Sequence, residues 1–377
     1  MKKVILAPDS FKGTMSSMEI CDIMETAIRE VEPGCRVIKL PVADGGEGTV
    51  AAMLAAAGGT RVTTRVSGPF GDEIESFYGL LDGGGIAVVE MAAAAGLPMV
   101  KGSEDPLRTT TYGVGQLIAA AVDRGARQVL VGLGGSCTND GGCGAAAALG
   151  VIFYNRDNEA FVPTGGTLRD IARIDVTQAK KRLQGVRVRL MCDVNNPLYG
   201  ENGAAYVFGP QKGADEAAVR ALDGGLRHLG ALLDEQCPGV SQRPGAGAAG
   251  GMGAGLTALL GAESVSGIDG VLDAVRFESM LEGCDMVFSG EGRIDGQSLR
   301  GKVIFGVCRR AKQYGVPVCA VVGDALDDQL GEAAGRGLCA VFTTNRRAVP
   351  VKEARLTARK DLYHTMKNIM SFLNAAK

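Results

Sequence analysis

The sequence of 377 residues contains no tryptophan, only two histidines and 5% aromatic residues. Two histidines argue against a serine–histidine–aspartate triad or a histidine-rich zinc site, because both chemistries depend on imidazole. No apolar run reaches about 18 residues, the length that spans a bilayer. No long basic tract occurs and the formal net charge is −2, which argues against nucleic acid or an anionic membrane as a partner.

Ten cysteines are scattered along the chain, and none forms a CxxC pair. Several fall in apolar segments, as reduced thiols do in the core of a cytoplasmic protein. The first residues pass directly into an apolar strand, without the pattern of a signal peptide. We therefore expect a cytoplasmic protein that does not associate with membranes. The sequence gives no indication of its oligomeric state.

Glycine is abundant, with 56 residues, roughly twice its usual share of about 7%. The glycines have no fixed period and gather where apolar runs end, which indicates loop chemistry at strand ends. A chain of this length exceeds a typical single core, so we expect two domains.

Short apolar runs at both ends of the chain indicate buried parallel strands, separated by helical patterns. A capping box, Ser16 with Glu19, begins the first helix. Two N-terminal strands and three C-terminal strands predict one five-stranded, doubly wound, Rossmann-like α/β sheet. The five runs are residues 4–7, 36–40, 286–288, 318–322 and 338–342.

The middle of the chain has closely spaced strands and a half-exposed alternating strand, which predict a mixed α/β domain inserted into the first. We place the discontinuous domain at residues 1–70 and 280–377 and the inserted domain at 71–279, with the active-site cleft between them. The turn at residues 82–85 predicts a hairpin. The Gly/Ala-rich stretch 243–255 is interpreted as a mobile loop.

Three loops that combine glycines with carboxylates each follow an apolar strand: residues 43–49, 134–142 and 289–296. Glycine lets a backbone approach a ligand and direct its N–H groups at an anion. A carboxylate beside such donors suits Mg²⁺ coordination or proton abstraction. Three such loops predict a phosphate-handling enzyme.

Smaller loops add charge and further ligands. Lys12 lies in the loop after the first strand, where a cation holds a phosphoryl or carboxylate group. Asp193 precedes two asparagines, an oxygen-rich set suited to Mg²⁺ or a substrate hydroxyl. Lys212 suits neutralisation of phosphate charge, Arg293 suits bidentate binding of a carboxylate, and Asp295 suits acceptance of a hydroxyl proton. Phosphoryl transfer needs these parts and little covalent chemistry.

These loops closely resemble those of the type I glycerate kinases. The resemblance lies in residues 8–13, 43–49, 134–142, 193–198, 208–213 and 289–295, and it extends from Lys3 to about Leu373. It implies ATP- and Mg²⁺-dependent phosphorylation of D-glycerate. It also implies a flavodoxin-like domain with an inserted domain and a cleft between them. Members of this family are generally linked to 2-phosphoglycerate, but the residues leave the 3-phosphate open.

The resulting hypothesis assigns roles by loop chemistry. Asp44 or Asp295 accepts the hydroxyl proton, with Lys12 and Asp193 as further catalytic residues. Asp193, with Asp140, holds Mg²⁺. The substrate-binding candidates are Ser10, Lys12, Gly45, Glu47 and Arg293. The ATP-binding candidates are Gly134, Gly135, Ser136, Thr138, Asn139, Gly141, Gly142 and Lys212.

Two other functions are consistent with parts of the sequence. Residues 132–136 prompt comparison with the GHMP small-molecule kinases, although Asp140 and two glycines intervene before the helix that this fold expects. A non-catalytic regulator that binds a metabolite on the same scaffold is the other alternative. It would lack some of the carboxylates, and none is lacking here.

Overall fold

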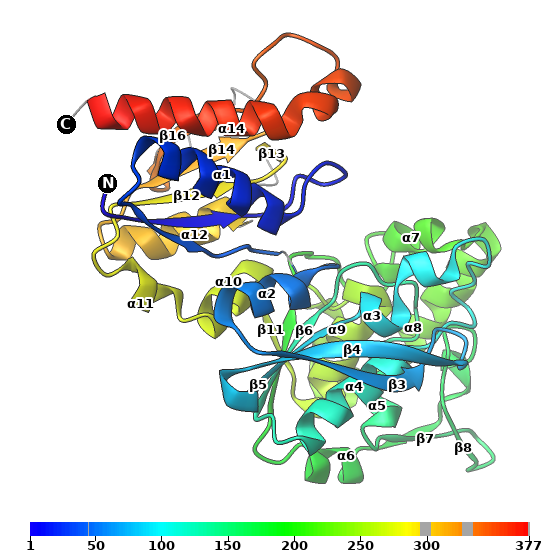
Figure 1. The fold of residues 1–377 in the computed structure, drawn as a ribbon. Helices are drawn as coiled ribbons and strands as arrows, with labels where there is room; N and C mark the ends of the chain where they lie inside the picture. Colours follow the sequence, from blue (N-terminus) through cyan, green and yellow to red (C-terminus); the bar gives the residue numbers. More distant parts are fainter. Residues whose placement is uncertain (44, 295–302, 326–334, 376–377) are drawn as a thin grey trace. The chain divides into compact units, whose positions relative to one another are not determined.

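The structure is a computed structural model that describes residues 1–43, 45–294, 303–325 and 335–375 (Figure 1). It divides into two compact units. The terminal unit comprises Met1–Asp44, Ala51–Gly58 and Gly267–Lys377, and the inserted unit comprises Gly45–Val50 and Gly59–Ser266. The large inserted segment begins at Gly59 and the return to the terminal unit begins at Gly267, both earlier in the chain than the predicted positions near residues 70 and 280.

The terminal unit contains a five-stranded, wholly parallel sheet in the order β16-β14-β12-β1-β2. With the strands numbered within this sheet alone, this is the 2-1-3-4-5 order of flavodoxin-like folds. The doubly wound sheet predicted from the sequence is therefore confirmed. Its strands are β1 (Lys3–Pro8), β2 (Arg36–Lys39), β12 (Met286–Gly290), β14 (Val318–Val322) and β16 (Leu338–Thr343).

Helices α1 (Ser17–Val31) and α14 (Val351–Ala375) cover one face of this sheet, and α12 (Val303–Gln313) covers the other (Figure 1). Val4, Leu6 and Phe288 alternate along their strands and share one apolar core with α1 and α14. The predicted capping box is present at the start of α1, because the Ser16 side chain accepts from the N–H of Glu19 and the Glu19 carboxylate accepts from that of Ser16.

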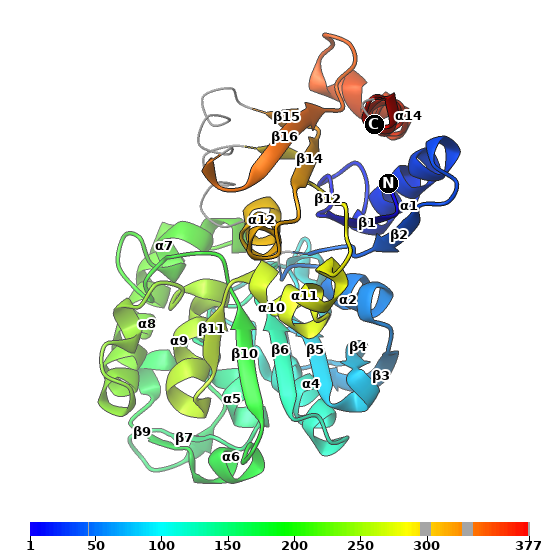
Figure 2. The same ribbon diagram turned by 90° about the vertical axis from the view of Figure 1, so that its left-hand side faces the viewer.

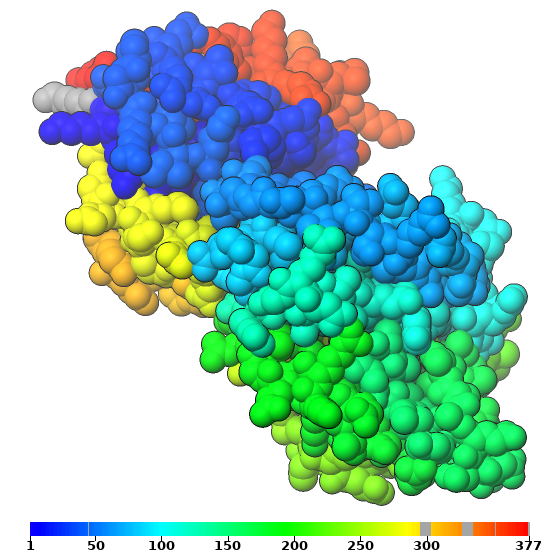
Figure 3. All heavy atoms as spheres, turned by 60° about the horizontal axis from the view of Figure 1, so that its bottom comes forward, coloured from blue at the N-terminus to red at the C-terminus, as the bar shows by residue number. Residues whose placement is uncertain are grey.

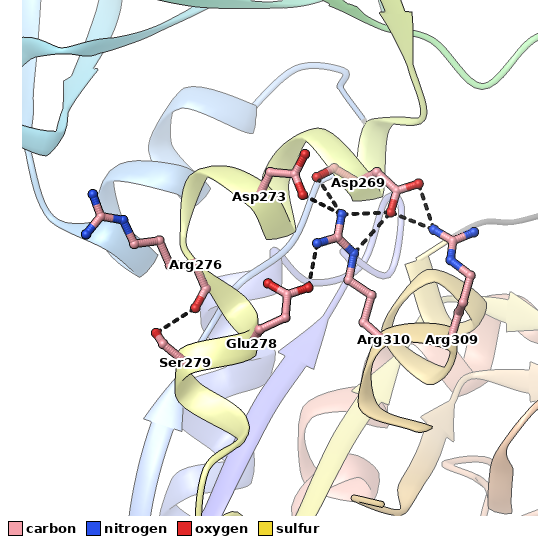
Figure 4. Close-up of polar contacts among 7 residues, drawn as sticks. All are labelled: Asp269, Asp273, Arg276, Glu278, Ser279, Arg309 and Arg310. Carbon is pink, nitrogen blue, oxygen red and sulfur yellow. Dashed lines mark hydrogen bonds and ion pairs between the residues drawn. The ribbon is translucent and has the colours of Figure 1, made fainter. Parts of the chain in front are cut away.

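The segment that returns to the terminal unit forms α10 (Gly267–Ala274) and α11 (Phe277–Leu281), which pack near α12 (Figure 4). Arg310 of α12 pairs with Asp269 at 3.0 Å, with Asp273 at 2.6 Å and with Glu278 at 2.6 Å. Arg309 pairs with Asp269 as well, at 2.6 Å. These ion pairs explain why the terminal unit begins again before residue 280.

The inserted unit contains a six-stranded mixed sheet in the order β11-β10-β6-β5-β4-β3 (Figure 2). β11, β10, β6 and β5 run parallel, whereas β4 is antiparallel to both β5 and β3. The predicted mixed α/β fold is thus confirmed. The strands are β3 (Thr60–Ser67), β4 (Glu73–Leu81), β5 (Ile86–Glu90), β6 (Gln128–Gly132), β10 (Arg187–Met191) and β11 (Glu263–Val265).

β3 pairs with β4 along its full length, which places residues 60–67 in the inserted unit rather than in the first domain. β3 forms one edge of the sheet, and its residues, blue in Figure 3, reach the surface. β4 and β5 pair directly on either side of residues 82–85, so the predicted hairpin is confirmed. A small second sheet is made of β7 (Ile152–Tyr154), β8 (Ala160–Phe161) and β9 (Arg173–Asp175).

The helices of the inserted unit pack with alternate residues of its parallel strands into one large core, which includes Val89, Val131 and Leu190. These helices are α3 (Ala92–Ala95), α4 (Tyr112–Asp123), α5 (Cys143–Ala148), α6 (Thr177–Arg182), α7 (Ala204–Phe208), α8 (Glu216–Gln236) and α9 (Ala248–Leu260). Within the described ranges, no helix combines the length and the apolar character that crossing a bilayer requires.

The prediction of a mobile loop at residues 243–255 is wrong. Most of this stretch is buried, and from Ala248 onward it belongs to α9. Its glycines allow backbones to touch in the core: a Cβ on Gly255 would lie 1.9 Å from the carbonyl oxygen of Gly141. A glycine-rich composition here reflects close packing rather than mobility.

Candidate functional site

In the inserted unit, loops distant in sequence meet at the carboxyl edge of the parallel strands. β6 leads into the 133–142 loop, and β10 leads into the 192–197 loop. Residues 45–50 lie against both strand ends, because the N–H of Gly134 donates to the carbonyl of Gly45 at 3.1 Å. A Cβ on Gly45 would also lie 3.1 Å from the Cβ of Met191, the last residue of β10. Open α/β sheets bind ligands at this edge.

Glycines make this convergence sterically feasible. A Cβ on Gly132 would lie 2.3 Å from the carbonyl oxygen of Gly45, and one on Gly134 would lie 2.6 Å from the Cα of Gly46. Such separations from backbone atoms exclude any side chain. Gly45 itself has φ +86°, a left-handed conformation that favours glycine. Glycine at these positions therefore lets the 45–50 loop pack directly against the end of β6 and the start of the loop that follows it.

Glu90, the last residue of β5, also contacts the 45–50 loop, and it was not among the predicted site residues. Its side chain is buried, and its two oxygens accept from the N–H of Val50 at 2.5 Å and of Gly48 at 3.2 Å. Burial raises the pKa of Glu90, against the opposing effect of these two hydrogen bonds, and the charge of Glu47 raises it further. An acid at the end of an apolar strand is the only sequence signal for it.

The 134–142 loop has an accessible part and a buried part. Gly135 is exposed, so its backbone remains available to a ligand, whereas Gly134 is half-buried and its N–H is engaged by the Gly45 carbonyl. Thr138, Asn139 and Asp140 are each 0% exposed. The predicted ATP contacts of Thr138 and Asn139 therefore lie beneath the surface, together with those of Gly141, Gly142 and Ser136.

The buried carboxylate of Asp140 links several backbone segments inside the unit by hydrogen bonds. One oxygen accepts from the N–H and the hydroxyl of Thr111, both at 2.8 Å, and from the N–H of Gly144 at 3.2 Å. The other oxygen accepts from the N–H of Gly142 at 3.0 Å. Burial raises the pKa of Asp140, and these bonds oppose the shift. This geometry does not support the predicted metal role of Asp140, because its oxygens are buried and engaged.

Lys212 is likewise an interior residue, only 1% exposed, and its Nζ donates to the carbonyl oxygen of Thr138 at 2.6 Å. Burial lowers its pKa to about 8, while the charges of Cys137 and Asp140 oppose that shift. The predicted role in neutralising nucleotide phosphates does not fit this position. The hydroxyl of Thr138 and the amide of Asn139 have no hydrogen-bond partner among the described residues.

Asp193 lies two residues after the end of β10 and is exposed, so its carboxylate is accessible at the carboxyl edge. In the same loop, the Asn196 side chain donates to the carbonyl of Asn202 at 2.8 Å. No group of three or more His, Cys, Asp or Glu side chains arranged for a metal occurs among the described residues. The metal role of Asp193 stays a prediction.

In the terminal unit, the predicted loops after β1 and β12 meet where the strand order reverses. The N–H of Asp9 donates to the carbonyl of Gly290 at 2.8 Å, and the Ser289 hydroxyl donates to that of Ala7 at 2.8 Å. Ser10 is half-buried and Lys12 is exposed at this edge. Reversal points of this kind bind ligands in doubly wound sheets.

Arg293 has a partner that the predicted roles did not include. Its guanidinium pairs with the carboxylate of Asp324, through Nη2 at 2.7 Å and Nε at 2.9 Å. The bridge joins the short strands β13 (Arg293–Ile294) and β15 (Asp324–Ala325). Asp44 and Asp295, the two candidate bases, lie outside the described residues, so their roles stay predictions.

Comparison with known proteins identifies the family, because the profile of the glycerate kinase family matches residues 4–374. The chain belongs to the glycerate kinase family. The family resemblance predicted from the loop motifs is confirmed. The matched residues include nearly all of both units.

Individual relatives agree with this assignment. A glycerate kinase from Halalkalibacterium halodurans is 43% identical over 371 residues, which cover 98% of this chain and 97% of that protein. A glycerate 2-kinase from Escherichia coli K12 is 42% identical over 373 residues, 98% of each chain. A crystal structure from Salmonella typhimurium LT2, assigned as glycerate kinase 2, matches with a TM-score of 0.88 at 40% identity. That match covers 100% of this chain and 99% of the other.

Proposed function

We propose that the protein transfers the terminal phosphoryl group of ATP to a hydroxyl of D-glycerate and forms 2-phosphoglycerate. The observation that carries this proposal is the meeting of the 45–50, 134–135 and Asp193 segments at one carboxyl edge, in a chain of the glycerate kinase family. The relative named glycerate 2-kinase supports the 2-phosphate as the product.

The accessible residues are suited to distinct parts of this reaction. The backbone N–H of the exposed Gly135 is placed to donate to phosphate oxygens, whereas that of Gly134 is engaged by the Gly45 carbonyl. Asp193 would hold Mg²⁺, which when bound neutralises phosphate charge. The 45–50 loop carries Glu47, exposed at the same edge as a candidate for the substrate hydroxyls.

Substrate binding in the terminal unit is assigned to Lys12, Ser10 and Arg293. Lys12 and Arg293 bind the glycerate carboxylate, and the existing pair with Asp324 orients the Arg293 guanidinium. Asp44 or Asp295 accepts the proton of the attacking hydroxyl. All ten cysteines are free thiols, which supports a reducing cytoplasmic location.

ADP release measured with and without D-glycerate tests the activity, and phosphorus NMR of the product distinguishes 2-phosphoglycerate from 3-phosphoglycerate. We expect glycerate-dependent ADP release and a phosphorus signal coupled to the single proton on carbon 2. ADP release that is independent of D-glycerate would contradict the proposal. A product phosphorylated on carbon 3 would overturn the regiochemistry alone.

The identity of the base is tested by Asp44→Asn and Asp295→Asn. The substitution that removes the base should lower turnover by about a hundredfold or more, because general-base catalysis contributes about 10²–10⁴-fold. Asp82→Asn is the matched control, since Asp82 begins the same Asp-Gly-Gly sequence but lies in the β4–β5 hairpin. Turnover near that of the wild type in either variant removes that aspartate from the role.

A further inference from the structure

The 45–50 loop is held at its sheet edge by a carboxylate from a different strand. We propose that Glu90 is a positioning residue for phosphoryl transfer: its carboxylate fixes the Gly48–Val50 end of the loop that carries Glu47 and follows Asp44. This inference rests on the proposed function, because it deepens the role of the same site. Glu90 itself is assigned no contact with substrate or nucleotide.

The hydrogen bonds of Glu90 span a long stretch of sequence. Its two oxygens accept from backbone N–H groups 42 and 40 residues earlier, those of Gly48 and Val50. Val50 lies in the first turn of α2 (Thr49–Ala57), where backbone N–H groups have no partner within the helix. A carboxylate at this end of a helix satisfies those donors and complements the helix dipole.

The two ends of the loop are attached in different ways. At its beginning, the Gly45 carbonyl accepts from the N–H of Gly134, so backbone contact fixes its position on β6. Toward its end, Glu90 binds the two N–H groups that flank Thr49. The exposed Glu47 lies between these attachments. Loss of the second attachment should release Glu47 while the first attachment stays in place.

The position of Glu90 points to function rather than to simple packing. Its side chain is 3% exposed, and burying a carboxylate costs free energy that an apolar residue of similar volume avoids. The carboxylate offsets this cost by accepting two hydrogen bonds, from the backbone N–H groups of Gly48 and Val50. Misplacement of a catalytic loop by about 1 Å can cost about 100-fold in rate, so these two bonds matter most for turnover.

The test compares Glu90→Gln with wild type and with Glu75→Gln, a matched change at an exposed glutamate of the neighbouring strand β4. Glutamine keeps one acceptor oxygen but presents an NH₂ group to the second backbone donor. We expect kcat to fall at least about tenfold with the KM for ATP within about twofold, because the loop is displaced while the nucleotide contacts persist. Glu75→Gln should behave as the wild type.

Hydrogen exchange gives a second readout that does not depend on activity. In Glu90→Gln the amides of residues 48–50 should exchange faster, while those of β6 and β10 keep their protection. A kcat near that of the wild type, or unchanged exchange at residues 48–50, would overturn the proposal. Loss of protection throughout the inserted unit would also count against it, because Glu90 would then support the fold rather than the loop.

These results remain distinguishable from failure of the proposed function. If the wild-type protein shows no D-glycerate-dependent ADP release, the proposed function fails, and the exchange measurement still decides whether Glu90 holds the loop. If the wild type is active and Glu90→Gln is equally active, only the positioning role fails.

Discussion

Gly132→Ala tests whether contact between the 45–50 loop and the end of β6 sets the geometry of the site. A Cβ at Gly132 would lie 2.3 Å from the carbonyl oxygen of Gly45, whereas side-chain contacts essentially never fall below 3.0 Å. The loop must therefore retreat by at least about 0.7 Å. The bond from the Gly134 N–H to the same carbonyl, now 3.1 Å, would be stretched or broken.

Two effects of different size follow from this displacement. Overpacking of this kind costs about 1–3 kcal/mol, so the free energy of unfolding should fall by that amount. A shift approaching 1 Å should lower kcat by about ten- to a hundredfold, because rate depends steeply on the position of reacting groups. Gly132 has no left-handed φ, so strain of the alanine backbone does not contribute.

Urea denaturation and the ADP-release assay measure the two effects on the same preparation. Gly34→Ala is the control, because a Cβ at Gly34 would have no atom within 4 Å and the φ of this residue is not left-handed. It should leave both quantities unchanged. A Gly132→Ala protein with wild-type stability and turnover would refute the close contact between the loop and the strand end.

Two further predictions concern charged side chains away from the loop. Arg310→Met should lower the free energy of unfolding by about 2–3 kcal/mol in urea denaturation, because three partly exposed carboxylates lose their shared partner. The more exposed Arg309→Met should cost less than about 1 kcal/mol, and equal losses would contradict this reasoning. Burial lowers the pKa of Lys212 to about 8 from 10.5, so the unfolded state holds its proton more tightly. The contribution of Lys212 to stability should therefore rise between these pH values, so the wild type should gain free energy of unfolding relative to Lys212→Met as the pH increases, whereas its difference from the exposed Lys101→Met should stay constant.

The sequence predicted the sheet of the terminal unit well, because its signals are local. Each strand is a short apolar run, and the Ser16–Glu19 capping box marks where α1 begins. The prediction of a mobile loop for the Gly/Ala-rich stretch that leads into α9 fails for a physical reason. Composition alone does not distinguish glycines that loosen a loop from glycines such as Gly255, whose backbone packs against Gly141.

Prediction of the site was limited by burial. The 134–142 loop was expected to present all its polar groups to a ligand, but Asn139 and Asp140 face the interior of the unit. The sequence predicts Lys212 as a phosphate ligand because it shows the charge of this side chain and not its burial. The sequence does not predict a role for Glu90, because that role depends on backbone donors some 40 residues away, which only the fold brings to it.

The division of the chain has a consequence for recombination between relatives. A chimera that takes residues 59–266 from one parent and the remainder from another would separate residues 45–50 from the surface that they evolved to fit. Mismatches would then arise at the Gly45–Gly132 contact and at Glu90, far from either crossover point. A chimera that takes residues 45–50 together with residues 59–266 from the same parent would keep the loop and the residues that it contacts from one protein.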